Sequence, residues 1–463
     1  MSHFLYSLIG LAAGVCFILA LKGLSKPKTA RRGNIIGAIG ATIATIVVFF
    51  YAQEGESLPL NNFGWIIGAI AVGVVIGVPA ARKVQMTQMP QLVALFNGVG
   101  GGAAALVAIV EYLHLGDTAN TAEVIATVFT VIVGCVSFSG SIITFLKLQE
   151  LMTTRPVVFP GGRFVIAGTL AATLGAAVWV VIELGTNPLL ILALLALAFG
   201  ILFVLPVGGA DVPIVISLLN AFTGLTVAAS GYVLDSTLLI IAGTLVGASG
   251  TILTRLMAEA MGRSLFGTLF GAFTAKPQEA SGSAEERPVR SGSPDDVAIL
   301  LNYARRVVIV PGFGLAVAQA QHTVRELADL MLAKGIDVAY GIHPVAGRMP
   351  GHMNVLLAES NVSYDKLVEM EDINPEFSST DVVLVVGAND VVNPAAHNDP
   401  ASPIYGMPIL DVENASHIIV NKRSMNAGYA GIENELFFNP KTSMPFGDTK
   451  AVLTKLVAEI KSL

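Results

Sequence analysis

Residues 306–317 read Arg-Val-Val-Ile-Val-Pro-Gly-Phe-Gly-Leu-Ala-Val. The apolar run at 306–310 predicts a buried strand, and the spacing of apolar residues at 316–333 predicts a helix. Between them, Gly312 allows a tight turn and Gly314 lets a pyrophosphate approach the backbone at the helix N-terminus. Val317 stands where the usual dinucleotide fingerprint has its third glycine. The segment favours a nucleotide-binding turn over a plain strand–helix turn.

The rest of this region repeats the alternation of strands and helices. Further strands are predicted at 338–342, 355–359, 382–386 and 417–420, and a terminal helix at 451–463. Such alternation is typical of a doubly wound, parallel α/β sheet of the Rossmann-like kind. The second half of the chain is therefore predicted to be a globular nucleotide-binding domain.

The choice of nucleotide follows from one missing and one added feature. An NAD site usually has an acid about 20 residues beyond the glycine turn, where it binds the ribose 2′-hydroxyl. Here the second strand ends Tyr340-Gly-Ile-His343 without an acid at its tip. A later strand ends in Lys422, Arg423 and Ser424, which suit an additional phosphate. The sequence favours NADP over NAD, although these cations taken alone also fit a solvated loop.

Composition divides the chain into two blocks. Of 463 residues, 54% are hydrophobic and only 13% are charged, whereas a soluble domain has roughly a quarter charged. Residues 1–264 hold 12 Lys and Arg against 10 Asp and Glu; residues 265–463 hold 15 against 23. The first block is predicted to lie in the membrane and the second to be soluble and acidic. The acidic balance argues against a nucleic-acid partner.

The membrane block contains apolar segments of the length that crosses a bilayer. Nine are predicted, at 4–21, 34–51, 63–81, 91–110, 123–146, 164–182, 188–207, 212–233 and 237–258. We interpret the first as a retained span, since no basic segment or cleavage site marks a signal peptide. All twelve basic residues of the block fall in alternate loops, which places the N-terminus outside and the soluble block in the cytoplasm.

Polar residues inside these spans are candidates for an ion path. Asn97, Ser141, Asp211, Asn220 and Thr223 lie in or at the ends of otherwise apolar helices. Ionisable and polar groups in lipid either line a path or join helices, and the residues alone do not separate the two. The glycines at 98–102 and 243–250 are interpreted as helix-packing positions. No His falls in a predicted span, and the two cysteines indicate neither a disulfide framework nor a metal site.

The junction between the blocks is rich in Pro, Gly and Ser over 274–296. Such a composition is typical of a flexible linker. The predicted organisation is a membrane domain over 1–264, a linker over 265–296 and a nucleotide-binding domain over 297–463.

Three long motifs make the chain recognisable. Residues 341–354 read Gly-Ile-His-Pro-Val-Ala-Gly-Arg-Met-Pro-Gly-His-Met-Asn, residues 387–394 Gly-Ala-Asn-Asp-Val-Val-Asn-Pro, and residues 422–429 Lys-Arg-Ser-Met-Asn-Ala-Gly-Tyr. With Met-Thr-Gln-Met-Pro at 86–90 and Gly-Gly-Ala-Asp-Val-Pro at 208–213, they resemble the beta subunit of proton-translocating NAD(P) transhydrogenases over the whole chain.

The resemblance implies an enzyme in three parts. A separate alpha subunit binds NAD(H), the membrane domain conducts protons, and the soluble domain binds NADP(H). The assembly is expected to be a hetero-oligomer, a dimer of alpha–beta units, in the bacterial inner membrane. By this resemblance, two segments contact the nucleotide phosphates. The first is the glycine turn, with Gly312, Phe313 and Gly314 and with Val317 at its end. The second consists of Val345, Ala346, Gly347, Arg348, Met349 and Pro350.

The same site is lined by Gly387, Ala388, Asn389, Asp390 and Val391, while Lys422, Arg423 and Ser424 match the 2′-phosphate readers. Gly428 and Tyr429 match a loop that covers the cofactor, and Asp390 matches an acid that links protonation to NADP(H) affinity. Asn97, Ser141, Asp211 and Asn220 match positions associated with proton transfer. No metal is implied.

One departure from the family concerns Asn97, where some members have a His that exchanges protons near neutral pH. An amide cannot do so, so a partner helix or a chain of waters is the expected source of the proton relay. The chain is expected to contribute half of a hydride transfer from NADH to NADP⁺ coupled to inward proton movement. The alternative is a transporter or channel gated by NADP(H) through a cytoplasmic sensing domain.

Overall fold

This computed structural model describes residues 3–25, 27–50, 62–116, 120–153, 156–208, 211–261, 264–265, 267, 289–347, 351–400, 402, 404–428 and 430–463. The chain divides into two compact units: Met1–Gly208 with Ile214–Thr254, and Gly209–Pro213 with Arg255–Leu463. Most of the predicted linker lies outside the described residues, as do the candidate site residues Arg348, Met349, Pro350 and Tyr429.

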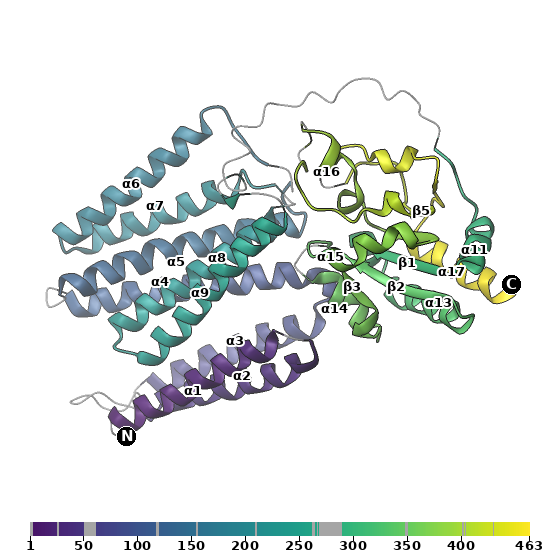
Figure 1. The fold of residues 1–463 in the computed structure, drawn as a ribbon. Helices are drawn as coiled ribbons and strands as arrows, with labels where there is room; N and C mark the ends of the chain where they lie inside the picture. Colours follow the sequence, from purple (N-terminus) through teal and green to yellow (C-terminus); the bar gives the residue numbers. More distant parts are fainter. Residues whose placement is uncertain are drawn as a thin grey trace. The chain divides into compact units, whose positions relative to one another are not determined.

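Long helices make up the first unit (Figure 1). In its described part they are α1 (His3–Leu24), α2 (Pro27–Val48), α3 (Phe63–Lys83), α4 (Met89–Leu115), α5 (Thr121–Leu148), α6 (Gly162–Ile182), α7 (Thr186–Val204), α8 (Val212–Val233) and α9 (Thr237–Ala260). Each overlaps one predicted span, although α2 begins seven residues before its span and ends three residues before the end of that span. Eight are long and apolar enough to cross a membrane. The other, α2, begins with a basic segment containing Arg31 and Arg32. The chain is thus a multi-pass membrane protein.

Small residues lie where these helices approach one another. A Cβ at Gly98 would meet the Ser141 side chain of α5 at 3.0 Å, and one at Gly250 would meet Ala221 of α8 at 3.0 Å. Close backbone approach of this kind supports helix association in lipid, where apolar burial gives little drive. The interpretation of these glycines as packing positions is confirmed.

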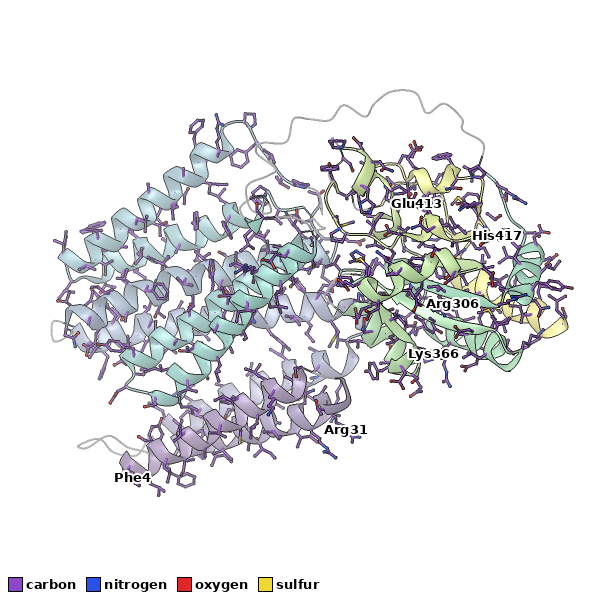
Figure 2. All side chains as sticks on the ribbon, viewed as in Figure 1. Phe4, Arg31, Arg306, Lys366, Glu413 and His417 are labelled. Carbon is purple, nitrogen blue, oxygen red and sulfur yellow. The ribbon has the colours of Figure 1, made fainter. Side chains whose placement is uncertain are left out.

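In α1 and α2, Phe4 and Arg31 mark opposite ends of a helix pair (Figure 2).

A parallel sheet forms the centre of the second unit. Its strands are β1 (Arg306–Pro311), β2 (Asp337–Ile342), β3 (Leu367–Glu369), β4 (Val382–Val386), β5 (His417–Asn421) and β6 (Thr442–Ser443). They follow the order β3-β2-β1-β4-β5-β6, and every pair is parallel. The predicted Rossmann-like fold is confirmed.

Buried side chains on both faces explain the continuous apolar strands. On one face, Val308 and Val310 of β1 and Val383 and Val385 of β4 join a core that includes Phe377. The helices around the sheet are α11 (Pro294–Tyr303), α12 (Phe313–Val317), α13 (Gln321–Ala333), α14 (His352–Glu359), α15 (Met370–Ile373), α16 (Ala395–Asn398) and α17 (Thr449–Ser462). Short 3-10 turns complete the unit: η5 (Tyr364–Lys366), η6 (Asn374–Ser379), η7 (Asp390–Val392), η8 (Val412–Asn414) and η9 (Glu435–Phe438).

Two sequence predictions in this unit are wrong. The helix predicted over 316–333 is two helices, because Gln319 adopts a left-handed conformation with φ of 51° and ends α12. The strand predicted over 355–359 lies within α14, whose buried residues His352, Met353, Leu356 and Leu357 follow helical spacing. The short strands β3 and β6 and the helix α11 have no counterpart among the predicted elements.

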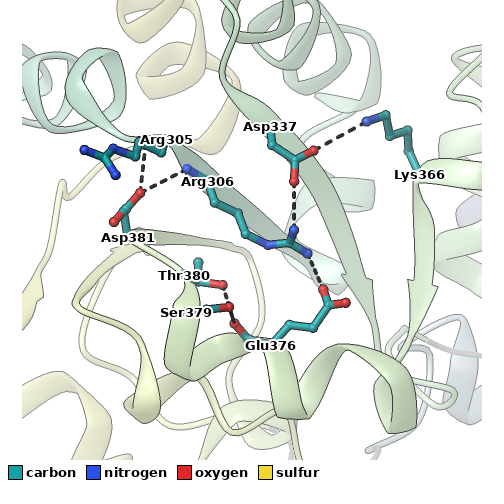
Figure 3. A network of polar contacts seen from close by, with 8 residues as sticks. All are labelled: Arg305, Arg306, Asp337, Lys366, Glu376, Ser379, Thr380 and Asp381. Atoms are coloured by element: carbon teal, nitrogen blue, oxygen red, sulfur yellow. Dashed lines mark hydrogen bonds and ion pairs between the residues drawn. The ribbon is translucent and has the colours of Figure 1, made fainter.

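The amino ends of the central strands are joined by a polar network (Figure 3). Arg306 donates to Asp337 at 2.8 Å and also pairs with Glu376. The Asp381 carboxylate accepts the main-chain N–H groups of Arg305 and Arg306 at 2.8 and 3.0 Å. These groups are partly exposed, so each ion pair contributes about 0–1 kcal/mol. The network connects the start of β1 with the starts of β2 and β4. It lies at the end of the sheet opposite the edge where ligands are expected to bind in such folds.

Candidate functional site

The strand order places a crevice between β1 and β4. From β1 the chain moves outward to β2 and β3, and it then returns to β4 on the other side of β1. Ligands of open α/β sheets bind at the carboxyl ends of the strands where the direction reverses. The glycine turn after β1 and the 387–391 segment after β4 meet at this point.

These two loops are in direct backbone contact. The Gly312 N–H donates to Val386 O, and the Gly314 N–H donates to Gly387 O, both at 2.9 Å. Gly387 has φ of 69°, and a Cβ there would lie 2.5 Å from the Gly314 Cα. Gly314 and Gly387 therefore allow the two loops to touch. The sequence had predicted Gly314 only for the approach of a pyrophosphate and Gly387 only for the lining of the site.

A cavity of about 330 Å³ opens beside this contact. It lies over the carboxyl ends of β4 and β5 and reaches the start of α17. Its lining brings together distant segments, namely Gly314, Val317, Ala318, Gly387, Ala388, Asn389, Asn421, Lys422, Arg423, Ser424, Asn426, Ala427, Gly428, Asp448 and Thr449. The lining residues that were not predicted as site residues are Ala318, Asn421, Asn426, Ala427, Asp448 and Thr449. Asp448 and Thr449 were missed because nothing in the local sequence shows that α17 begins at this edge.

Lys422 is held by its surroundings. Its main chain pairs with Phe446, and its carbonyl accepts the Gly447 N–H at 3.0 Å. The Nζ donates to Asn426 O at 2.8 Å and lies 4.5 Å from the centre of the Phe437 ring. Burial lowers the pKa of this ammonium, while the nearby Asp390 carboxylate raises it. Lys422 thus closes the 422–426 loop as well as bringing a positive charge to the cavity.

Arg423 and Ser424 differ from Lys422 in being exposed. Neither forms a side-chain hydrogen bond within the described part of the chain. Both side chains line the cavity and keep their donors available, as an anion-binding edge requires.

His343 fixes the start of the 343–347 loop. The ring is buried; its Nδ1 accepts the Val345 N–H at 3.3 Å, and its Nε2 lies 2.8 Å from Pro408 O. These contacts select the neutral tautomer with hydrogen on Nε2. Burial lowers the pKa of the imidazole against the opposing effects of the Pro408 hydrogen bond and Glu371.

The 345–347 loop lies beside the glycine turn. The Phe313 and His352 rings are in contact, with centroids 6.1 Å apart, and a Cβ at Gly347 would overlap the His352 ring. Val345, Ala346 and Gly347 are thereby brought next to the turn. Arg348, Met349 and Pro350 lie outside the described residues, so their positions stay a prediction.

Gly428 and residues 430–434 are anchored on Asn389 and Asp390. Asp390 Oδ2 accepts the Ala430 N–H at 3.0 Å, and Asn434 Nδ2 donates to Asn389 O and Oδ1 at 3.0 and 3.2 Å. A Cβ at Gly428 would lie 2.5 Å from both Asn389 Nδ2 and Asp390 Oδ1, so a glycine is required there. The buried Asn389 Nδ2 has no hydrogen-bond acceptor among the described residues.

A polar cluster lies among the membrane helices. Asn97 of α4 donates to Ser141 Oγ at 3.0 Å and to Ser137 Oγ at 3.3 Å. Ser137 Oγ in turn lies 2.6 Å from Thr223 Oγ1 and donates to Leu219 O at 3.0 Å, both in α8. The cluster joins α4, α5 and α8 through groups that are mostly buried.

The structure gathers only some of the predicted membrane residues. Asn97, Ser141 and Thr223 belong to the cluster, whereas Asp211 precedes α8 and Asn220 forms no hydrogen bond with the cluster within the described residues. Ser137 was missed, although its position four residues before Ser141 puts both on one helix face. His114 lies in the last turn of α4, which extends beyond the predicted span.

Comparison with known proteins relates nearly the whole chain to one family. A family model described as NAD(P) transhydrogenase beta subunit matches residues 6–459. The chain is 46% identical over 466 residues to the NAD(P) transhydrogenase subunit beta of Rhodospirillum rubrum, covering 99% of both chains. The same values hold for the protein of that name from the R. rubrum strain ATCC 11170.

Proposed function

Because the chain belongs to the NAD(P) transhydrogenase beta-subunit family, we propose that it binds NADP(H) and couples hydride transfer to proton translocation. An alpha subunit binds NAD(H) and supplies the second nicotinamide. Hydride passes from NADH to NADP⁺ while a proton moves inward. The protein lies in the bacterial inner membrane with its sheet unit in the cytoplasm, in a hetero-oligomer built from alpha–beta units.

The observation that carries this proposal is a glycine-lined crevice with the exposed hydrogen-bond donors of Arg423 and Ser424 at its edge. The contact between Gly314 and Gly387 leaves backbone at the mouth of the cavity, where phosphates bind. Arg423 and Ser424 face the same cavity and suit the 2′-phosphate that distinguishes NADP from NAD. Asn389 Nδ2, which has no acceptor among the residues that the structure describes, supplies a further donor. The described residues therefore fit NADP(H).

In the hydride step these residues bind and orient. The nicotinamide ring of the bound cofactor accepts or donates the hydride, and direct transfer requires no side-chain acid or base. The chain holds one ring against the partner's ring and excludes water from the space between them. The 428–434 segment, anchored through Asp390 and Asn434, covers the cofactor.

Coupling requires a difference in NADP(H) affinity between two states. Asp390 is suited to this role because it holds Ala430 of the covering segment and acts on the charge of Lys422. A change in the protonation of Asp390 would alter both the segment and the cationic edge of the cavity.

In the membrane, the Asn97–Ser137–Ser141–Thr223 cluster forms part of the proton path. Hydroxyl and amide groups donate and accept hydrogen bonds and so orient water, but they do not take up a proton at neutral pH. The titrating group is therefore provided by a helix of the partner subunit or by a chain of waters. Asp211 and Asn220, which lie between Ser141 and Thr223 in the chain, are further members of the proposed path.

The proposal is tested with the chain purified alone and with its alpha subunit in sealed vesicles. The complex should transfer hydride from NADH to NADP⁺, and the pH of the vesicle lumen should change in proportion to the hydride transferred. The chain alone should transfer none, because only one dinucleotide site is present. An NADP(H)-gated channel, the alternative, would instead move protons without hydride transfer when NADPH is added to the chain alone.

A further inference from the structure

Lys147 is a fully buried cation in a membrane helix. It lies in the last turn of α5 and is 0% exposed. Lysine is rarely buried without partners, and in a membrane protein such a residue usually has a specific role. Neither the nucleotide site nor the polar cluster described above uses it.

The partners of Lys147 are all main-chain carbonyls. Its Nζ lies 3.2 Å from Val204 O, 2.6 Å from Leu205 O and 2.7 Å from Val207 O. An ammonium group has three N–H donors, so all of them are used. Helix α7 ends at Val204, and its last carbonyls have no N–H partner within the helix. Lys147 caps this end, where the helix dipole also favours a positive charge.

The capped segment leads directly into α8. Helix α5 holds α8 at a second place, because Ser137 is bonded to Leu219 O and Thr223. Ser137 and Lys147 are ten residues apart on α5, about 15 Å along the helix axis. The α7–α8 segment is thus attached to α5 at both the polar cluster and the helix end.

We propose that Lys147 is a positioning residue for proton translocation, which clamps the α7–α8 junction to α5 and so keeps Thr223 and Leu219 aligned with Ser137. The inference rests on the proposed function. The clamp requires several N–H donors at one point, and a positive charge strengthens their bonds to the carbonyls. A guanidinium meets that requirement, a carboxamide meets it in part, and a thioether does not.

The test compares Lys147→Arg, Lys147→Gln and Lys147→Met in the complex with the alpha subunit, reconstituted in vesicles. Lys22→Met serves as the control, since Lys22 is a cation in the last turn of α1 but is exposed. Three quantities are measured: assembled complex per vesicle, protons moved per hydride transferred, and the Kd for NADPH.

We expect Lys147→Met to lower the proton-to-hydride ratio about tenfold while the Kd for NADPH stays within about twofold, because Val207 O loses the donor that Lys147 supplies. Val204 O and Leu205 O keep the main-chain N–H groups of Val207 and Val157 but lose the ammonium that ties them to α5. Lys147→Arg should keep at least about half of the wild-type ratio, and Lys22→Met all of it. If Lys147→Met does not assemble, the comparison of Arg with Gln decides, with Gln expected about threefold below Arg.

Wild-type coupling in the Met variant, or equal coupling in Arg and Gln, would overturn the positioning role. An Arg variant as uncoupled as the Met variant would also overturn it, because a fixed charge would then be insufficient. Failure of the wild-type complex to move protons while it transfers hydride would instead refute the proposed function.

Discussion

Replacing Arg423 by Gln separates recognition of the 2′-phosphate from recognition of the rest of the nucleotide. Arg423 is exposed at the cavity edge and forms no side-chain hydrogen bond within the described residues, so the change removes no contact of the unliganded fold there. A charge-assisted hydrogen bond contributes about 1.5–3 kcal/mol, and solvent screening at an exposed site favours the lower end. The NADPH affinity should fall about 10- to 30-fold, which corresponds to about 1.5–2 kcal/mol.

Isothermal titration calorimetry of residues 289–463, which contain the whole sheet and its core, measures NADPH and NADH binding to each variant. NADH lacks the 2′-phosphate, so its weaker affinity should not change. Lys455→Gln is the matched control, because Lys455 is exposed on α17 and does not line the cavity. An equal loss for both nucleotides, or no loss for NADPH, would show that Arg423 does not read the 2′-phosphate.

Three further outcomes follow from the described contacts. Gly387→Ala should lower the melting temperature of this unit by about 4–8 °C, since φ of 69° and the Gly314 contact together cost about 2 kcal/mol; Gly406→Ala, with φ of 80° and open space around it, should cost less. Burial lowers the pKa of His343, so below pH 6.5 the ring takes up a proton in the unfolded chain but not in the folded one. The free energy of unfolding from denaturant titrations should therefore fall as the pH drops below 6.5, and it should fall less steeply in His343→Gln. Ser137→Ala should reduce proton pumping per assembled complex in vesicles, with unchanged NADPH binding; unchanged pumping would remove the cluster from the path.

The sequence predicted the main architecture because its signals are local. Long apolar segments identify membrane helices by length alone, since the bilayer sets that length. The apolar strand at 306–310 and the glycine turn after it likewise identify a parallel sheet. The same reasoning failed at 355–359, where a short apolar run fits a strand or a helix, and only the packing of Leu356 and Leu357 selects the helix.

Site residues were predicted where their segments carry unusual motifs, as at 387–391 and 422–424. The way in which these segments meet depends on strand order, which brings β1 beside β4 although 70 residues separate Pro311 from Val382 in the chain. Only that order reveals that Gly314 makes room for Gly387 and that α17 begins at the cavity.

The membrane unit shows the same division between local and tertiary information. Charge distribution and hydropathy determine which segments span the membrane and predict their direction. They can do so because the free energy of moving a residue from water into the bilayer depends on that residue's own side chain. The partner of a buried polar group depends instead on which helices pack together. Ser137 became part of the cluster only through contacts with α4 and α8, and Lys147 became a cap for α7 only through contacts with the end of that helix, all of them distant in the sequence.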